Sequence, residues 1–460
     1  MNLERTLHPT KGEARPAALG LYDSGDDALL MERVVERERV ILALARVQQN
    51  KGSPGIDGMT VESLRDHLRG TWPTLRKQLL AGTYKPQSVK RVEIPKANGG
   101  MRELGIPTVV DRFIQQAVLQ ILQPRLDPSF SESSYGFRPG RRAHEAVCAA
   151  QKYIQEGRRW VVDVDLEKFF DRVNHDVLMS RVAKRVADKR LLRLIGSYLV
   201  AGIMANGVDV ERTNGVPQGG PLSPLLANVL LDEIDKELEK RGHAFVRYAD
   251  DCNVYVRSRK AGERVMKALQ RSFERLRLRI NESKSAVARP WERKFLGYSF
   301  WVSKGIRVGR RISDQAIAKM KARVRSITAR HGRSIASMIV ELRSFLLGWR
   351  NYFYLAETPR ALRTLESWIR RRLRAVQLRH WKRSPRIIRE LVARGIALLD
   401  ARWLARHTGR WWFQSRSPQM HRAFPVSYYD GLGLPRLATQ PIRTAGCGPA
   451  CPVVWQGSPA

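Results

Sequence analysis

Residues 245–256 read Phe-Val-Arg-Tyr-Ala-Asp-Asp-Cys-Asn-Val-Tyr-Val, so that two adjacent aspartates, Asp250 and Asp251, lie between apolar, β-forming flanks. This pattern is typical of two strands joined by a tight turn. Adjacent carboxylates repel each other unless cations lie between them, and Mg²⁺ prefers oxygen ligands such as carboxylates. Because aspartate is also common in ordinary turns, this stretch alone leaves a hydrophilic turn and a metal site about equally open.

A second acidic stretch favours the metal site. Residues 160–171 read Trp-Val-Val-Asp-Val-Asp-Leu-Glu-Lys-Phe-Phe-Asp, which predicts a buried strand that ends in an acidic turn and enters a helix. Asp165, beside a strand carrying Asp250 and Asp251, would complete a cup of carboxylates for two metal ions. Such ions, about 3.5–4 Å apart, clamp the attacking and leaving oxygens of a phosphoryl displacement. Residues 216–224, Val-Pro-Gln-Gly-Gly-Pro-Leu-Ser-Pro, predict a loop entering an apolar helix whose N-terminus could face phosphate.

The charge of the chain points to a polyanionic partner. Its 82 Lys and Arg residues against 44 Asp and Glu residues give a formal net charge of +38, and the commonest polyanion is a phosphate backbone. The alternative is a basic membrane-surface or ribosome-associated protein. The 43% hydrophobic fraction is that of a globular protein. The four cysteines form no legible disulfide framework, and no apolar run reaches membrane-spanning length, so we expect a cytosolic protein.

The coarse pattern predicts a mixed α/β body followed by helices. Apolar residues recur at helical spacing over 30–49, and residues 89–106 alternate in the manner of a β-hairpin. Short strands and helices then alternate to about residue 300. After residue 312 the spacing predicts three basic helices, the third of which begins at Pro359.

The motifs, taken in order, resemble the conserved blocks of reverse transcriptases, most closely those encoded by bacterial group II introns. The matching runs are Ile94-Pro95-Lys96, Gly99-Gly100-Met101-Arg102, Gly105-Ile106-Pro107-Thr108, Tyr135-Gly136-Phe137-Arg138-Pro139-Gly140-Arg141, the Asp165 stretch, Pro217-Gln218-Gly219-Gly220, Tyr248-Ala249-Asp250-Asp251, Asn281-Glu282-Ser283-Lys284 and Phe295-Leu296-Gly297-Tyr298. Beyond them, Gly348-Trp349-Arg350-Asn351-Tyr352-Phe353 resembles the maturase-specific module, and Gly431-Leu432-Gly433-Leu434-Pro435 a motif near the end of such proteins. The resemblance spans about residues 30–437.

The resemblance implies a right-hand polymerase: fingers and a palm with a ferredoxin-like sheet, followed by an all-helical thumb. We therefore expect a flexible N-terminal segment (1–29), reverse transcriptase fingers and palm (30–312), a helical thumb or maturase domain (313–383), a basic nucleic-acid-binding segment (384–437) and a flexible tail (438–460).

The resemblance also implies roles for individual residues at a polymerase site. The residues expected to hold two Mg²⁺ ions, with Mn²⁺ as a substitute, are Asp165, Leu166, Asp250 and Asp251, and the three aspartates are catalytic. Those expected to bind the nucleotide are Lys96 and Arg102 as a triphosphate clamp, Gln218, and Phe170 as a gate against a ribose 2′-OH. A core role for Phe170 remains open. Asp163 and Asp171 are not expected to be ligands.

Further residues are expected to contact nucleic acid. Gly55, Ile56, Asp57 and Gly58 match a template-contacting loop, although a generic turn would explain them nearly as well. Lys284 matches a position near the palm, or is an ordinary solvated lysine. Arg363, Arg370 and Arg374 share one side of the third basic helix and are expected to contact intron RNA. For His144 and His175, solvated or core roles are favoured over catalysis.

The implied function is RNA-directed DNA synthesis on intron RNA during retrohoming, combined with a maturase role in splicing. The implied partners are intron RNA, target DNA serving as primer and dNTPs in the bacterial cytosol, and a homodimer is compatible with the resemblance. Two alternatives remain: a splicing-only RNA-binding maturase, and a domesticated reverse transcriptase of DNA repair or phage defence. After the maturase region the sequence offers no cluster of metal ligands, because the last histidine is His421 and Cys447 and Cys451 form a lone pair, so an endonuclease-lacking type is expected.

Overall fold

The computed structural model describes residues 29–95, 101–205, 208–210, 214–303, 307–329, 332–406 and 409–438. The two terminal segments expected to be flexible thus lie almost entirely outside the described residues, and so do Lys96, Cys447 and Cys451. The chain separates into two compact units, each of which draws on distant parts of the sequence. The first comprises residues up to 128 together with 173–226, and the second comprises 129–172 together with the residues from 227 onward.

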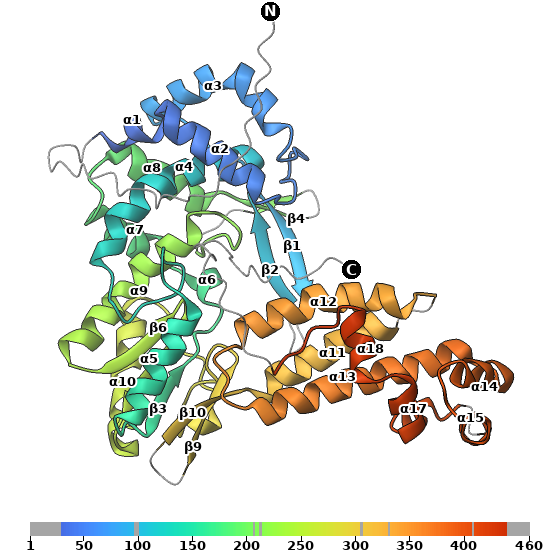
Figure 1. Cartoon of the computed structure of the whole chain (residues 1–460). Helices are drawn as coiled ribbons and strands as arrows, with labels where there is room; N and C mark the ends of the chain where they lie inside the picture. Colours follow the sequence, from blue (N-terminus) through green and yellow to red (C-terminus); the bar gives the residue numbers. More distant parts are fainter. Residues whose placement is uncertain are drawn as a thin grey trace, which may run out of the picture. The chain divides into compact units, whose positions relative to one another are not determined.

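The first unit contains a small sheet and a set of helices (Figure 1). Its strands, in the order β2-β1-β4-β5, are β1 (Val89–Pro95), β2 (Met101–Ile106), β4 (Ile203–Ala205) and β5 (Val208–Val210). Its helices are α1 (Leu30–Val34), α2 (Arg37–Gln49), α3 (Leu64–Ala81), α4 (Val109–Leu126), α7 (His175–Ala183) and α8 (Lys189–Val200). The predicted hairpin is confirmed, because β1 and β2 pair antiparallel from Lys90↔Ile106 to Pro95↔Met101.

The single helix expected over residues 30–49 is wrong, because the chain forms α1 and α2 with a break after Val34. The buried residues explain the break. Leu30 and Val34 are buried in α1, whereas Ala43 and Val47 are buried in α2. At 100° per residue, a continuous helix would place these two pairs on opposite sides. A bend in the chain lets both faces pack inward.

The second unit is built on a four-stranded antiparallel sheet in the order β6-β7-β3-β8. The strands are β3 (Trp160–Val164), β6 (Ala244–Tyr248), β7 (Asp251–Val256) and β8 (Ala286–Ala288), and the nearby helices are α5 (Ala143–Gln155), α6 (Phe169–Arg172), α9 (Ser223–Lys240) and α10 (Arg259–Arg275). Helical segments separate β3 from β6, and α10 separates β7 from β8. This is the β-α-β-β-α-β arrangement, so the ferredoxin-like palm sheet is confirmed.

Helix α10 covers one face of this sheet because its sequence allows a close approach. The Ser258 hydroxyl caps the helix by accepting a hydrogen bond from the Ala261 amide at 3.2 Å. Gly262 then faces the sheet, where an added Cβ would lie 2.5 Å from a methyl group of Val287. Val265, buried one turn further along, continues the apolar stripe.

The C-terminal half of this unit is helical after one hairpin, as predicted. The hairpin consists of β9 (Tyr298–Ser303) and β10 (Arg307–Ile312), and the helices are α11 (Asp314–Ala329), α12 (Ile335–Tyr352), α13 (Pro359–Trp381), α14 (Ser384–Val392), α15 (Leu398–Ala405), α16 (Trp411–Gln414), α17 (Pro418–Ala423) and α18 (Val426–Gly431). Short 3₁₀ turns lie at Asp127–Ser129 and Pro290–Glu292. Among the described helices, none combines the length and the apolar character that a membrane span requires.

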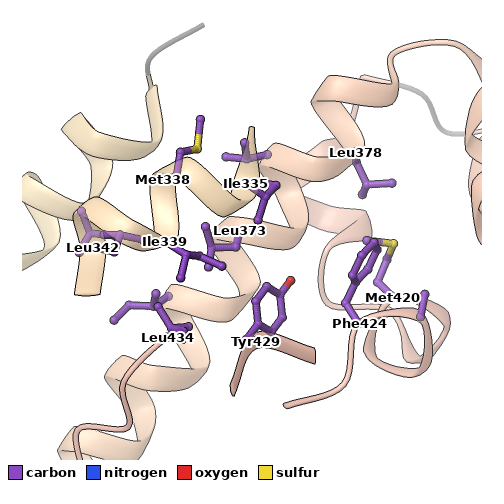
Figure 2. Close-up of a cluster of buried hydrophobic side chains, with 14 of the residues drawn as sticks. Ile335, Met338, Ile339, Leu342, Leu373, Leu378, Met420, Phe424, Tyr429 and Leu434 are labelled. Carbon is purple, nitrogen blue, oxygen red and sulfur yellow. The ribbon is translucent and has the colours of Figure 1, made fainter. Parts of the chain in front are cut away.

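One hydrophobic core joins these helices. Figure 2 shows side chains of α12 (Ile335, Met338, Ile339, Leu342), α13 (Leu373, Leu378) and the C-terminal segment from α17 onward (Met420, Phe424, Tyr429, Leu434) gathered in it. The same core continues through Ile387 and Leu391 of α14. Residue 383 is the predicted boundary between the thumb or maturase domain and the basic segment, and helices on both sides of it share this core.

Candidate active site

The palm sheet brings the three predicted aspartates to one end. Strands β3 and β7 pair antiparallel with Val164 opposite Cys252, so Asp165, which directly follows β3, and Asp251, the first residue of β7, lie at the same end of the pair. In the neighbouring hairpin, Tyr248 of β6 pairs with Asp251, which leaves only Ala249 and Asp250 in the turn. The strand register therefore gathers aspartates that are far apart in the sequence.

The turn that carries Asp250 is tightly constrained. Ala249 adopts a left-handed backbone conformation with φ of 58°, which costs a non-glycine residue roughly 1–3 kcal/mol. Gly136 packs directly against this turn, and a Cβ added there would lie 2.1 Å from the Ala249 nitrogen. Residue 136 must therefore be glycine, which gives a structural reason for the Tyr135-Gly136-Phe137 run.

Beneath the turn, Arg247 and Asp235 form a buried ion pair. Their side chains are 2% and 0% exposed, and Nη2 of Arg247 lies 2.5 Å from Oδ2 of Asp235. Although burial alone would lower it, Asp235 raises the pKa of Arg247 and keeps the guanidinium charged. Nη1 of Arg247 donates to the Ala249 carbonyl at 2.9 Å and to Oδ1 of Asn228 at 2.9 Å. The Asn228 amide in turn donates to the Gly136 carbonyl at 3.0 Å. This network, from here on the hairpin anchor, holds both segments that meet at the turn carrying Asp250.

Asp165 is held by a separate loop. The Asn281 amide donates to the Asp165 carbonyl at 2.8 Å, and the Asp165 amide donates to the Ser285 hydroxyl at 3.0 Å. Nζ of Lys284 lies 3.5 Å from the Asp165 carboxylate. The loop over 281–285 thus sets the position of the aspartate and supplies a cation beside it. Lys284 therefore lies at the site, while its predicted contact with nucleic acid stays a prediction.

The carboxylates at this end of the sheet repel one another. Burial raises the pKa of Asp251 well above its ordinary value, and the charges of Asp163, Asp250 and Asp165 raise it further. Burial likewise raises the pKa of Asp163, but Arg293 opposes the shift, with its Nε 2.6 Å from the Asp163 carboxylate. Asp163 is thus ion-paired, which agrees with its exclusion as a ligand.

This donor set fits a divalent metal. Within the described residues, no three His, Cys, Asp or Glu side chains already stand at metal-ligand spacing. The carboxylates of Asp165, Asp250 and Asp251 are nevertheless close enough for their mutual repulsion to shift a pKa, and a cation would relieve that repulsion. Carboxylate oxygens are also the hard donors that Mg²⁺ prefers. Leu166 is buried and bridges to Ile280, and its assignment to the metal stays a prediction.

The two phenylalanines after Asp165 have different environments. Phe169 is 3% exposed and fills the core, whereas Phe170 is half-buried and meets the Phe169 ring edge-on at 5.1 Å. The core position is therefore occupied by Phe169, which leaves Phe170 available at the start of α6. Phe170 is therefore not a fully buried core residue, and its role as a gate stays a prediction.

The other predicted nucleotide-binding residues belong to the first unit. The Gln218 carbonyl accepts a hydrogen bond from the Gly105 amide at 3.2 Å, and an added Cβ on Gly219 would lie 2.7 Å from the Gly105 carbonyl oxygen. The glycine-rich loop is thus shaped to lie flat against the end of β2. Arg102 lies in β2, its side chain lies outside the described residues, and so does Lys96.

The loop over residues 55–58 has a structural reason of its own. A Cβ added to Gly55 would lie 2.6 Å from the Thr108 backbone, and Gly58 has a φ of 70°. Asp57 is exposed and accepts a hydrogen bond from the Met59 amide, while Ile56 is half-buried. Both glycines are therefore explained by packing and turn geometry, and template contact stays a prediction.

The expectation that Arg363, Arg370 and Arg374 share a solvent-exposed face is wrong for Arg374. Its side chain is 3% exposed and donates to the carbonyls of Ser415 at 3.0 Å and Phe424 at 3.5 Å. The segment after α15 folds over that side of α13. Arg370 is mostly buried and lies 3.6 Å from Glu366, so only Arg363 is exposed.

This difference predicts opposite phenotypes for two Arg→Gln variants. Arg363→Gln should weaken RNA binding and lower the log–log salt slope by about 0.7–0.9, because an exposed phosphate contact is lost. Arg374→Gln should instead lower the free energy of unfolding by about 1.5–3 kcal/mol, because buried charged hydrogen bonds are lost. RNA titrations at several salt concentrations and thermal unfolding distinguish them. An unchanged slope for Arg363→Gln would show that this arginine is merely solvated.

The two histidines near the motifs serve packing. His144 Nε2 lies 2.7 Å from the Tyr352 carbonyl oxygen, and His175 Nε2 lies 2.7 Å from that of Gly215. Neither needs a catalytic role.

The hairpin anchor contains residues that the sequence analysis missed. The sequence did contain one indication of the hairpin anchor. Arg247 is a charged residue within an apolar strand, and such a charge needs a buried partner.

An antiparallel β-α-β-β-α-β sheet with three aspartates at one end defines the palm of a nucleic-acid polymerase. Comparison with known families agrees. Residues 94–300 match the reverse transcriptase (RNA-dependent DNA polymerase) family, and residues 317–392 match the group II intron, maturase-specific domain. The chain therefore contains a reverse transcriptase region and a group II intron maturase-specific region. This family depends on divalent metal ions.

Individual proteins are also similar in sequence to parts of this chain. Protein YkfC of Escherichia coli (strain K12) is 36% identical over 233 residues, which cover 48% of this chain and 61% of YkfC. The group II intron-encoded protein LtrA of Lactococcus lactis subsp. cremoris is 37% identical over 203 residues, which cover 42% of this chain and 32% of LtrA. The chain thus spans less than two thirds of either relative. A chain of a solved structure titled "Partial Cas6-RT-Cas1--Cas2 complex" is 27% identical, covering 53% of this chain and 42% of that one, with a TM-score of 0.36.

Proposed function

We propose that this protein copies intron RNA into DNA and also assists splicing of that RNA as a maturase. The observation that carries the proposal is the register of the palm sheet, which brings Asp165 and Asp251 to the same end of the β3–β7 pair, beside the Asp250 turn. The maturase part is supported by the match of residues 317–392 and by the net charge of +38. Its partners would be intron RNA, a DNA primer end at the target site and dNTPs.

In this proposal Asp165, Asp250 and Asp251 hold Mg²⁺, with Mn²⁺ as a substitute. When bound, the ions would supply activation of the primer 3′-hydroxyl and neutralisation of charge on the nucleotide phosphates. The protein positions its carboxylates through the hairpin anchor and the 281–285 loop. Lys284 would balance the charge of Asp165 before the metal binds. Lys96, Arg102 and Gln218 are assigned to the nucleotide on the motif resemblance, and a guanidinium suits a triphosphate.

Two assays on the purified full chain test the two activities separately. Primer extension on an intron RNA template with dNTPs and Mg²⁺ should yield full-length cDNA. Self-splicing of the same intron at low Mg²⁺ should accelerate when the protein is added. Extension without splicing stimulation would favour a domesticated reverse transcriptase, and stimulation without extension would favour a splicing-only maturase. Failure of both would refute the proposal.

The position of Phe170 predicts a change in sugar selectivity. Phe170→Ala should raise the kcat/KM for a ribonucleotide relative to the matching deoxynucleotide by about tenfold or more, because the ring would occupy the space that a 2′-OH needs. The ratio for one base in both sugar forms measures this effect. Phe169→Leu is the control, since Phe169 lies in the core and should change stability without changing the ratio. An unchanged ratio in Phe170→Ala would assign Phe170 to packing.

A further inference from the structure

An open surface groove of about 480 Å³ lies along α13 and α16 in the C-terminal half of the second unit. This volume lies within the range of pockets that hold small molecules. It is lined by Arg372, Ala375, Val376, Arg379, Gly409, Arg410, Trp411, Trp412 and Phe413, and we call it the α13–α16 groove. None of the described residues that line it is acidic.

Arginines gather at the groove without carboxylate partners in its lining. Arg372 donates to the Thr328 hydroxyl at 2.5 Å, and Arg379 donates to the Thr328 carbonyl at 3.2 Å, so neutral oxygens hold both guanidinium groups. Burial lowers the pKa of Arg372, and the charges of Arg325 and Arg379 lower it further. These cations repel one another across a short distance. An anion in the groove would relieve that repulsion.

Exposed aromatic rings flank the same groove. Trp412 is 43% exposed and Phe413 is 51% exposed, although rings of this size normally find cover. The Arg371 guanidinium lies 4.0 Å from the centre of the Trp412 ring and donates to the Trp412 carbonyl at 3.0 Å, so one face of the ring packs against a held guanidinium. Exposed rings beside arginines are the elements with which proteins bind unpaired nucleotides.

The combination selects one class of occupant. An acidic peptide could pair with the arginines but would leave the rings uncovered. A duplex could contact the charges, but its bases stack on each other and offer no free faces. One wall of the groove, α13, lies within the maturase-specific match, which favours RNA over DNA as the strand. Unpaired nucleotides of RNA satisfy both the charges and the rings.

We propose that the α13–α16 groove binds a single-stranded segment of RNA, with a base stacked on Trp412 and a phosphate beside Arg410. This inference rests on the proposed binding of intron RNA and adds where an unpaired stretch of it is held. Arg410 is exposed at the start of α16, so its guanidinium can reach a strand without breaking contacts inside the core.

Fluorescence titration of the full chain with a 12-nucleotide oligouridine tests the proposal. Trp412→Ala should weaken binding about tenfold to hundredfold with an unchanged salt slope, since stacking is lost and no phosphate contact is. Trp412→Phe should restore most of the affinity. Arg410→Gln should lower the log–log salt slope by about 0.7. Trp403→Ala, at a tryptophan that is 47% exposed on α15, is the matched control and should bind like the unmodified chain.

Three further arms decide the nature of the occupant. A 12-base-pair RNA duplex should bind equally well to the unmodified chain and to Trp412→Ala. A deoxyuridine oligomer of the same length should bind more weakly than the RNA, and equal or tighter binding would overturn the assignment to RNA. If the unmodified chain binds intron RNA but oligouridine affinity is unchanged in Trp412→Ala, the groove proposal fails while the proposed function stands. If the unmodified chain binds neither RNA, the proposed function fails first.

Discussion

Replacing Asp250 or Asp165 by asparagine should reduce cDNA synthesis by about 10³-fold or more, while RNA affinity stays within about twofold. The substitution removes a charged metal ligand but keeps the shape of the side chain. Metal ligands stabilise charge that develops in the transition state, so their loss acts on the rate. RNA affinity is spread over many basic residues of a chain with a net charge of +38, so one lost carboxylate changes it little.

The measurement is primer extension on an RNA template, run beside a filter-binding titration of the same RNA. Asp171→Asn is the matched control, because Asp171 is an exposed aspartate of α6, six residues after Asp165, and lies outside the proposed ligand set. It should extend primers at the normal rate. Undiminished primer extension by Asp250→Asn or Asp165→Asn would show that the substituted aspartate is not catalytic. Loss of RNA binding in parallel would point to a folding defect instead.

Local patterns were sufficient to predict the elements that carry the candidate site, because strand alternation and turn residues depend on neighbours in the sequence. The Asp250 turn, the strand ending at Asp165 and the helices after residue 312 all follow from such patterns. The ferredoxin-like sheet was inferred from the resemblance, and the pairing of β3 with β7, from Trp160↔Val256 to Val164↔Cys252, agrees with it. The spacing after residue 312 also predicted the helices α11, α12 and α13, which share one core.

Contacts between distant segments were beyond such patterns. The helical period put Arg374 on one side of α13 with Arg363, but it could not show that residues 415–424 cover that side. In the same way, α1 and α2 separate because each buries a different face. The chain also enters each compact unit twice, which a linear sequence of composition changes does not express.

The hairpin anchor is also formed by segments that are distant in the sequence, and its ion pair should contribute strongly to stability. Arg247→Met should lower the free energy of unfolding by about 3–5 kcal/mol, because Asp235 would be left buried and unpaired. Thermal or urea unfolding measures this loss. This single substitution does not separate the effect of the ion pair on stability from its effect on the position of Asp250, since an unstable protein also loses activity.

The double variant Arg247→Met with Asp235→Leu separates the two effects. Replacing a buried ion pair by apolar side chains of similar volume often restores stability, so most of the loss in the free energy of unfolding should be recovered. The Ala249 carbonyl would still lack its donor, so the turn carrying Asp250 would lose a constraint. We expect cDNA synthesis by this stable double variant to remain about 10²-fold reduced, the size of effect expected from a misplaced catalytic group.

A second measurement shows whether the defect lies at the metal site. If Arg247 positions Asp250 and Asp251, the Mg²⁺ concentration for half-maximal extension should rise in the double variant, and calorimetric titration with Mn²⁺ should show weaker binding without any nucleotide present. RNA affinity should not change, because the anchor is buried away from solvent. A double variant that regains stability, extension rate and Mn²⁺ affinity together would show that Arg247 only supports the fold. Restored stability with persistently weak Mn²⁺ binding would establish that the buried pair acts on metal binding through the turn that carries Asp250, because Arg247 donates to the Ala249 carbonyl in that turn.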